Sequence, residues 1–203
     1  MKRKKCLNIS LLGDTCVGKT CIVNSFIGNE FTETLKTFGI IENIIKKTFD
    51  NSEYKFKIFD TAGEKKYRSI SNSTIQIADG FFLVFSVDNK ESFEKAISWI
   101  ESIEWNYDLE GKVIYLLENK IDVEPEKKQV TKEEVEVFAK RKNFKYFETS
   151  ARSGKGINEA FEEMFKDVYE KYKMNKDKTD CLHNINKGDK KKKFKNHCLN
   201  AEN

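Results

Sequence analysis

Short apolar runs alternate with longer amphipathic segments over most of this 203-residue chain. Each short run has the length of a buried strand, and each longer segment repeats its apolar residues at helical spacing. Strands that alternate with helices are joined by right-handed crossovers and form a mostly parallel sheet. We therefore expect an α/β fold. In such sheets, ligands bind beyond the carboxyl ends of the strands, so residues that directly follow a strand are the first candidates for a site.

We expect six strands flanked by about five helices, four of which the pattern locates. Two of the strands are joined by a turn at Asp50–Ser52 and should pair as a hairpin. Thr131 stands three residues before Glu134, a capping box that predicts a helix start. The predicted strands are Leu7–Leu12, Ile40–Phe49, Tyr54–Phe59, Phe81–Val87, Val113–Leu117 and Tyr146–Phe147. The predicted helices are Lys19–Ile27, Glu91–Trp105, one that starts at Thr131, and Asn158–Tyr172.

The apolar periodicity ends near Met174, so we expect one domain over residues 1–173 and a disordered basic tail over residues 174–203. The tail holds eight lysines and four acidic residues, and it therefore carries the whole formal net charge of +4. The neutral body has no surplus charge for a nucleic-acid backbone, so no nucleic-acid partner is expected. Five scattered cysteines favour a reducing compartment, and no apolar run is long enough to cross a bilayer. A cytoplasmic or peripherally membrane-bound protein is expected.

A glycine-containing motif directly follows the first predicted strand. Residues 13–20 read Gly-Asp-Thr-Cys-Val-Gly-Lys-Thr and match the phosphate-loop pattern G-x-x-x-x-G-K-[ST]. Glycines allow successive backbone N–H groups to point at phosphate oxygens, and the following helix adds its positive N-terminal end. In this pattern Lys19 reaches the β- and γ-phosphates, and the Thr20 hydroxyl binds Mg²⁺. The motif does not identify the base or the reaction, because ATPases, kinases and GTPases all use it.

A second motif, Asn119-Lys120-Ile121-Asp122, follows the strand expected to end at Leu117. Guanine presents an N1–H and an exocyclic amino group, which one carboxylate can accept together as a charge-assisted pair. Adenine lacks this pair of donors, so Asp122 can select guanine. Taken alone, the motif is equally well explained as a polar turn.

Together these motifs resemble the small GTPases of the Ras superfamily, and most closely the Rab family. Residues 60–63 match its Asp-Thr-Ala-Gly motif, and residues 149–152, Thr-Ser-Ala-Arg, resemble its Glu-Thr-Ser-Ala-Lys segment. The motifs occur in the family's order, and the chain between the last two lacks the extra helix of Rho proteins. The resemblance covers Lys5 to about Tyr172 and implies the P-loop NTPase fold, GTP or GDP as ligand, Mg²⁺ as cofactor and a monomeric state.

The resemblance also implies a role for each matching residue. Asn119 would brace the loops, and the Ala151 N–H would meet the guanine O6. Mg²⁺ would be held by Thr20, Thr37 and, through water, Asp60. Catalysis would involve Lys19, the Gly63 N–H at the γ-phosphate, and Glu64. Nucleotide contacts are implied for Gly13, Asp14, Thr15, Cys16, Val17, Gly18, Lys19, Thr20, Cys21, Phe31 near the guanine, Thr37, Gly63, Asn119, Lys120 over the base, Asp122, Ser150, Ala151 and Arg152.

Glu64 departs from the family, which has Gln directly after Asp-Thr-Ala-Gly. That Gln orients the attacking water. Gln both donates and accepts hydrogen bonds, whereas an ionised carboxylate only accepts them and adds charge near the γ-phosphate. Slow hydrolysis is therefore expected without help. The alternative is that a partner protein supplies the missing group.

Two further departures concern the regions that change with the nucleotide. The segment between Phe31 and Thr37 is one residue shorter than usual, so the Mg²⁺ contact of Thr37 is left open. An aromatic trio through which effectors read Rab proteins is also altered. Glu42 and either Thr74 or Ile75 occupy two of its positions, and Phe59 replaces Trp. We expect unusual effectors, with neutral surface change as the alternative.

The tail lacks the usual prenylation signal, because Cys198 lies too far from the end for C-a-a-X. The run Lys190–Lys195 could attract anionic lipid, although one polybasic patch without a lipid anchor binds weakly and reversibly. A zinc site from Cys181, His183, His197 and Cys198 is disfavoured by their irregular spacing.

The sequence leaves three candidate functions. The leading one is a GTP-driven switch in vesicle trafficking, with an exchange factor, a GAP and effectors as partners on the cytosolic face of an endomembrane. The second is a binding module that loads GTP but barely hydrolyses it, which Glu64 favours. The third, a P-loop phosphotransferase such as a nucleoside kinase, would need a lid and a second substrate pocket, for which the chain has no obvious insertion.

Overall fold

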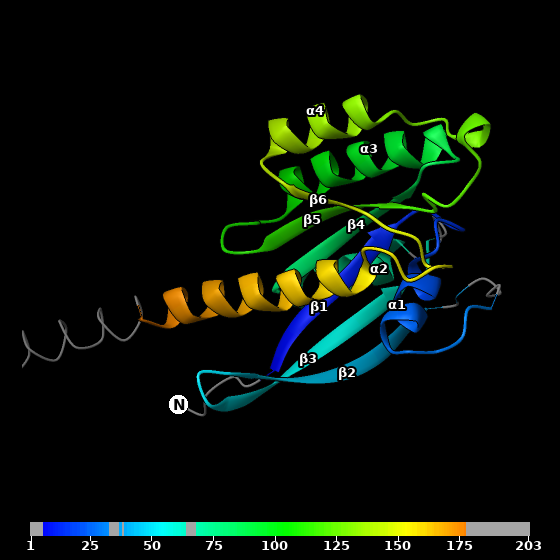
Figure 1. Ribbon diagram of the computed structural model, residues 1–203. Coiled ribbons are helices and arrows are strands. Elements are labelled where there is room, and N and C mark those ends of the chain that lie inside the picture. Colours follow the sequence, from blue (N-terminus) through cyan, green and yellow to red (C-terminus); the bar gives the residue numbers. More distant parts are fainter. Residues whose placement is uncertain (1–5, 33–36, 38, 64–67, 178–203) are drawn as a thin grey trace, which may run out of the picture.

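The computed structural model describes residues 6–32, 37, 39–63 and 68–177. Its centre is one six-stranded sheet with the order β2-β3-β1-β4-β5-β6 (Figure 1). The strands are β1 (Cys6–Gly13), β2 (Ile40–Phe49), β3 (Ser52–Thr61), β4 (Gly80–Ser86), β5 (Val113–Asn119) and β6 (Lys145–Glu148). β2 runs antiparallel to β3, and every other neighbouring pair is parallel. The predicted α/β fold with a mostly parallel sheet is confirmed.

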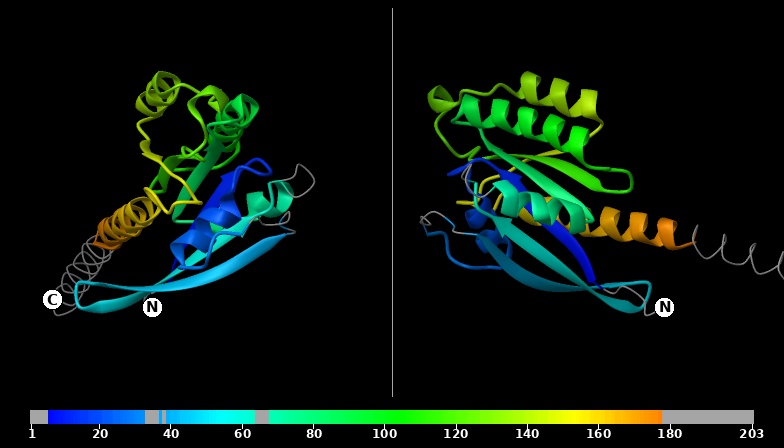
Figure 2. Two further views of the ribbon diagram at one scale, coloured as in Figure 1. Left: turned by 45° about the vertical axis from the view of Figure 1, so that its right-hand side comes forward. Right: turned by 180° about the vertical axis from the view of Figure 1, so that it is seen from behind.

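Helices cover both faces of the sheet, and each face has its own core. The helices are α1 (Lys19–Phe26), α2 (Arg68–Ile77), α3 (Lys90–Asn106), the short 3-10 helix η2 (Pro125–Lys127), α4 (Lys132–Lys142) and a last helix over residues 157–177. On one face, α1 and the last helix bury Ile22, Phe161 and Phe165 against the sheet. On the other, Ile75 of α2 and Ile100 of α3 lie in a second buried cluster with residues of α4. α3 and α4 run side by side in all views (Figures 1 and 2).

Most predicted elements lie within a few residues of the observed ones. The capping box at α4 is present, since the Thr131 hydroxyl accepts from the Glu134 N–H and the Glu134 carboxylate accepts from the Thr131 N–H. The hairpin turn is shorter than predicted. Asp50 and Asn51 both adopt positive φ (47° and 57°), and Phe49 pairs with Ser52, so the loop has two residues. Such a two-residue turn matches the twist of the strands that it joins, and Ser52 therefore begins β3.

Two observed elements were absent from the predicted ones: the short 3-10 helix η2 and the longer helix α2. The case of α2 is the more informative. The sequence of α2 is rich in Ser, Asn and Thr, which favour turns and caps over helix interiors. Tertiary contacts stabilise it instead. Ile75 is fully buried, and the hydroxyls of Thr74 and Ser10 share a buried hydrogen bond of 2.8 Å between α2 and β1.

The last helix continues to residue 177, so residues 174–177 are helical, and the tail does not begin at 174 as expected. Helix elongation adds one backbone hydrogen bond per residue without requiring further core contacts, which explains why apolar periodicity underestimates the length. The predicted tail features, Lys190–Lys195 and the tail cysteines and histidines, lie outside the described residues. Within the described part of the chain, no helix is long and apolar enough to cross a membrane.

Candidate functional site

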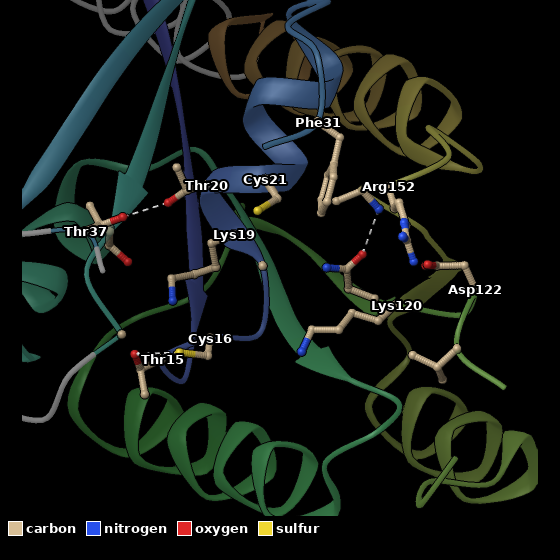
Figure 3. A pocket seen from close by; sticks show the side chains of 16 residues that line it. Thr15, Cys16, Lys19, Thr20, Cys21, Phe31, Thr37, Lys120, Asp122 and Arg152 are labelled. Atoms are coloured by element: carbon tan, nitrogen blue, oxygen red, sulfur yellow. Dashed lines mark hydrogen bonds between the residues drawn. The ribbon is translucent and has the colours of Figure 1, made fainter. Parts of the chain in front are cut away.

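A cavity of about 470 Å³ opens at the carboxyl ends of β1, β3 and β5, where the parallel arrangement brings their following loops to one edge. Figure 3 shows two groups of side chains in it, with Lys19, Thr20 and Thr37 at one end and Phe31, Asp122 and Arg152 at the other. Its walls are formed by Thr15, Cys16, Gly18, Lys19, Thr20, Cys21, Phe31, Thr37, Thr61, Gly63, Asn119, Lys120, Asp122, Val123, Ala151 and Arg152.

The loop between β1 and α1 has a backbone that only glycine fits at two points. Gly13 (φ 153°) lies so close to β4 that a Cβ would be 2.2 Å from the Val84 carbonyl oxygen. Gly18 (φ 96°) is the N-cap residue of α1, and a Cβ there would be 2.3 Å from Nδ2 of Asn119. The loop is thus closely packed between β4 and the second motif.

Lys19 is a buried cation inside this loop, with only 5% of its surface exposed. Its Nζ donates to the carbonyl oxygens of Gly13 (2.9 Å) and Asp14 (2.7 Å). Burial lowers the pKa of Lys19 to about 8, although Asp60 and Asp14 favour the charged form. A lysine held in this way is an electrostatic partner for an anion entering the cavity.

Three oxygen-bearing side chains meet beside Lys19. The hydroxyls of Thr20 and Thr37 share a hydrogen bond of 2.7 Å (Figure 3), and Thr20 donates to Oδ2 of Asp60 at 2.5 Å. Burial raises the pKa of Asp60, while the Thr20 hydroxyl and Lys19 oppose this shift.

The other carboxylate oxygen of this cluster, Oδ1 of Asp60, is buried and has no hydrogen-bond partner among the described residues. A buried acceptor without a partner is costly, so an additional donor or cation is expected there. Two hydroxyls and a carboxylate are the hard oxygen donors that Mg²⁺ prefers, often with retained waters. The donor set therefore fits a magnesium ion. Thr37 thus lies beside Thr20, although the segment between Phe31 and Thr37 is one residue shorter than in the family.

Gly63 forms the wall between the third strand and the phosphate loop. A Cβ at Gly63 would lie 2.4 Å from the carbonyl carbon and oxygen of Asp14 and from the amide nitrogen of Thr15. Any side chain here would push the two segments apart, so Gly63 allows a backbone-to-backbone contact at the end of the cavity.

At the other end, Asn119 is a buried bracket, 1% exposed, that joins three segments. Its Nδ2 donates to the Val17 carbonyl at 2.8 Å, and its Oδ1 accepts from the Ala151 N–H at 3.1 Å. The Thr149 hydroxyl is 3.5 Å from the same Oδ1. The side chain thereby connects β5 with the phosphate loop and with the loop after β6.

The remaining residues of this end are more open. Lys120 has a positive φ of 65°, and its Nζ lies 3.4 Å from the Asp88 carboxylate. Phe31 is 43% exposed and, in Figure 3, extends toward Arg152 and Asp122. A flat apolar ring and a carboxylate at one opening provide the stacking surface and the acceptor that a purine such as guanine would need.

Most of the predicted nucleotide contacts line this cavity, and four act from behind it. Gly13 and Asp14 present carbonyls to Lys19, and Val17 presents one to Asn119. Ser150 is fully buried, and its Oγ accepts from the Ser153 N–H. Asp60 contributes through Thr20, and Glu64 lies outside the described residues. Two lining residues were not predicted, Thr61 and Val123. Thr61 belongs to the Asp-Thr-Ala-Gly motif, which was a signal for it, whereas Val123 has no distinctive pattern.

Comparison with known proteins agrees with this arrangement. Residues 8–170 match the model of the Ras family. Three relatives called Ras-related protein Rab-13, from Bos taurus, Mesocricetus auratus and Rattus norvegicus, are each 34% identical to the chain over 159 residues. The match covers 78% of this chain and 77% of each relative. The chain therefore belongs to the Ras family, as a divergent, Rab-like small GTPase.

Proposed function

We propose that this small GTPase binds GTP in a Mg²⁺-dependent way, hydrolyses it slowly, and acts as a molecular switch in vesicle trafficking. The observation that carries the proposal is one cavity with a buried cation and an oxygen cluster at one end and an opening lined by Phe31, Asp122 and Ala151 at the other. Both ends are needed to hold a nucleoside triphosphate.

At the phosphate end, backbone N–H groups from Cys16 to Thr20 and the ammonium of Lys19 would receive the β- and γ-phosphates. Thr20 and Thr37 would hold the magnesium ion directly, and Asp60 would hold it through water. When bound, the ion neutralises charge that develops on the phosphate oxygens. The Gly63 N–H would reach the γ-phosphate. Thr37 and Gly63 would then change position when that phosphate is lost, which is how a nucleotide state becomes visible to a partner.

At the base end, Asp122 would accept the N1–H and amino group of guanine. The Ala151 N–H, which in this structure donates to Oδ1 of Asn119, would be shared with the guanine O6. Adenine has an amino group where guanine has O6, so both contacts would reject it. Phe31 and Lys120 would cover the faces of the base.

Hydrolysis is proposed to be slow because Glu64 stands where the family has Gln. Its carboxylate cannot donate a hydrogen bond, and it adds negative charge near the γ-phosphate. The same residue supports a second candidate, a signalling module that loads GTP and barely hydrolyses it alone. If a GAP supplies an arginine that stabilises the transition state, the protein would hydrolyse GTP and act as a switch; without such a GAP, it would remain loaded with GTP.

As a member of the Ras family, the chain is expected to work with regulators and effectors. We propose that it acts as a monomer on the cytosolic face of an endomembrane, with the lysine-rich tail as an electrostatic contact to anionic lipid. Among the altered positions, Phe59 and Thr74 or Ile75 are buried, whereas Glu42 on β2 is exposed. Glu42 therefore supports the proposal of effectors unlike those of other Rab-like proteins.

Single-turnover hydrolysis tests this proposal. Full-length protein is loaded with GTP and Mg²⁺, and release of phosphate is followed for the wild type and for Glu64→Gln. We expect a measurable but slow rate for the wild type and a rate at least about tenfold higher for the variant. Equal rates would refute the assigned role of Glu64. Retention of GTP with no turnover in either protein would favour the binding module.

A further inference from the structure

Asp14 introduces a negative charge into the loop that is proposed to bind phosphate. A carboxylate in this place repels an anionic ligand unless a cation compensates for it. Its side chain is only 16% exposed, so water screens the charge incompletely. One oxygen, Oδ1, accepts from the Thr15 N–H at 2.8 Å. The other, Oδ2, accepts from Nζ of Lys95 on α3 at 2.7 Å.

The backbone of Asp14 is also the point where three segments meet. Its carbonyl accepts from Nζ of Lys19 at 2.7 Å. Gly63 lies against the same carbonyl, since a Cβ there would be 2.4 Å away. A shift of Asp14 would therefore disturb both the buried lysine and the glycine proposed to contact the γ-phosphate.

We propose that Lys95 is a positioning residue for GTP: it neutralises and holds Asp14, and thereby favours the triphosphate over the diphosphate. This inference rests on the proposed function, because it concerns the same nucleotide. The triphosphate brings an additional charged group to the end of the cavity where Asp14 meets Gly63. The diphosphate lacks that group and depends less on the ion pair.

The local electrostatics agree with the geometry. Burial by itself would raise the pKa of Asp14, but the hydrogen bonds from Lys95 and Thr15 bring it below its ordinary value. The hydrogen bond to Asp14 is also the main reason that the pKa of Lys95 is raised. Lys95 is 30% exposed and has a second partner, Glu91, at 2.8 Å one helical turn away. The Glu91 side chain is 71% exposed and pairs with the same Nζ. Glu91→Gln therefore removes a charge beside Lys95 while it leaves Asp14 and its charge in place, which makes it a matched control.

A purely structural tie between α3 and the loop would make a different prediction. Loss of such a tie would weaken GTP and GDP equally and lower the thermal stability of the protein. A charge effect would act mainly on GTP, and it would disappear when the charge of Asp14 is removed. Asp14→Asn keeps an oxygen that can accept from Thr15 while it removes the charge, so this variant separates the two explanations.

The test measures dissociation of fluorescent GDP and of a non-hydrolysable GTP analogue from full-length protein with Mg²⁺. We expect Lys95→Gln to release the analogue about five- to tenfold faster and GDP less than about twofold faster. Glu91→Gln should change neither rate, and Lys95→Arg should restore the wild-type ratio. The double variant Asp14→Asn, Lys95→Gln should recover most of the retention of the analogue.

Equal acceleration for both nucleotides, or no recovery in the double variant, would overturn the inference and leave the proposed function intact. Failure of the wild type to bind either guanine nucleotide would refute the proposed function itself. If Lys95→Gln does not fold, Asp14→Asn alone still tests the inference, because this variant should retain the analogue at least as well as the wild type does. If Asp14→Asn accelerated release of the analogue, relative to the wild type, more than it accelerated release of GDP, the inference would also be overturned.

Discussion

The phosphate end and the base end of the cavity are built differently. At the phosphate end, the functional groups are buried and already joined to one another, as Lys19 is to two carbonyls and Thr20 is to Thr37 and Asp60. At the base end, Phe31 is largely exposed, and the buried contacts belong to Asn119, which lies behind the opening. At the phosphate end, the side chains that would contact the ligand are already held in place by hydrogen bonds. At the base end, the backbone is held by Asn119, but a side chain that would contact the base, Phe31, is partly exposed.

This difference suggests a division of labour. Preorganised charges contribute most to affinity, because little reorganisation is needed when the ligand arrives. Hydrogen-bonding groups on an open rim contribute selectivity, because a wrong base leaves them unpaired. Substitutions at the two ends should therefore change different quantities, and the predictions below test that separation in order of decreasing effect.

The largest effect is expected from Lys19→Ala. It removes the buried ammonium that faces the phosphates, and should weaken GTP and GDP by about a thousandfold, roughly 4 kcal/mol, with guanine still preferred over adenine. Equilibrium titration with fluorescent nucleotides measures this. Lys46→Ala, at an exposed lysine of β2, is the control and should bind normally. If the affinity fell by less than about tenfold, the phosphate end would not supply most of the binding free energy.

Asp122→Asn is expected to act on selectivity. The amide cannot accept two hydrogen bonds from guanine as a carboxylate does, so GDP should bind about a hundredfold more weakly while ADP changes little. Competition titrations with both nucleotides provide the ratio, and Glu124→Gln in the exposed neighbouring loop serves as control. If ADP weakened as much as GDP, the two ends would not be separable.

Asn119→Ala should affect both ends, because this side chain joins them. The substitution leaves the Val17 carbonyl and the Ala151 N–H without their partner, which should cost about 2 kcal/mol of unfolding free energy. Chemical denaturation of nucleotide-free protein measures the loss. The comparison variant is Asn106→Ala, whose amide donates to the Ser102 carbonyl within α3. Unchanged stability in Asn119→Ala would mean that the bracket does not hold the frame.

The smallest effect is expected behind the base end, at Glu118 on β5. Burial raises its pKa, the hydroxyl of Tyr146 opposes the shift by donating to it, and Glu148 adds to it. Since the folded-state pKa lies above the ordinary value, ionised Glu118 disfavours folding, and this cost disappears as the pH falls through that raised pKa.

Glu118→Gln keeps an acceptor for Tyr146 and removes the charge. We expect it to stabilise the protein by up to about 1 kcal/mol at neutral pH, and the gain should shrink as the pH is lowered toward 4.5, the ordinary pKa of the group. Denaturation curves across this pH range measure the difference. GDP affinity should be unchanged at neutral pH. A gain that grew at lower pH would have the wrong sign for this explanation.

How much the sequence predicts also differs between regions. The strands and the α4 capping box follow from local patterns, apolar runs and a Thr-x-x-Glu spacing, and local patterns are visible in sequence. α2 could not be predicted in this way, because Ser and Asn are poor helix formers and its support comes from Ser10, a residue far away in the chain.

The site shows the same division. Residues of the phosphate and base motifs were identified from their spacing, and most of them line the cavity. The ion pair between Asp14 and Lys95 was not predicted, because nothing in the sequence indicates which lysine of α3 faces the phosphate loop. That information exists only after β1 and α3 have packed together.

Titration of nucleotide-free protein with GDP and with ADP, both in the presence of Mg²⁺, tests the central claim most directly. If a carboxylate selects the base while the phosphate loop supplies most of the affinity, GDP should bind at least about a hundredfold more tightly than ADP. Equal affinities for the two nucleotides, or no binding of GDP, would contradict the account.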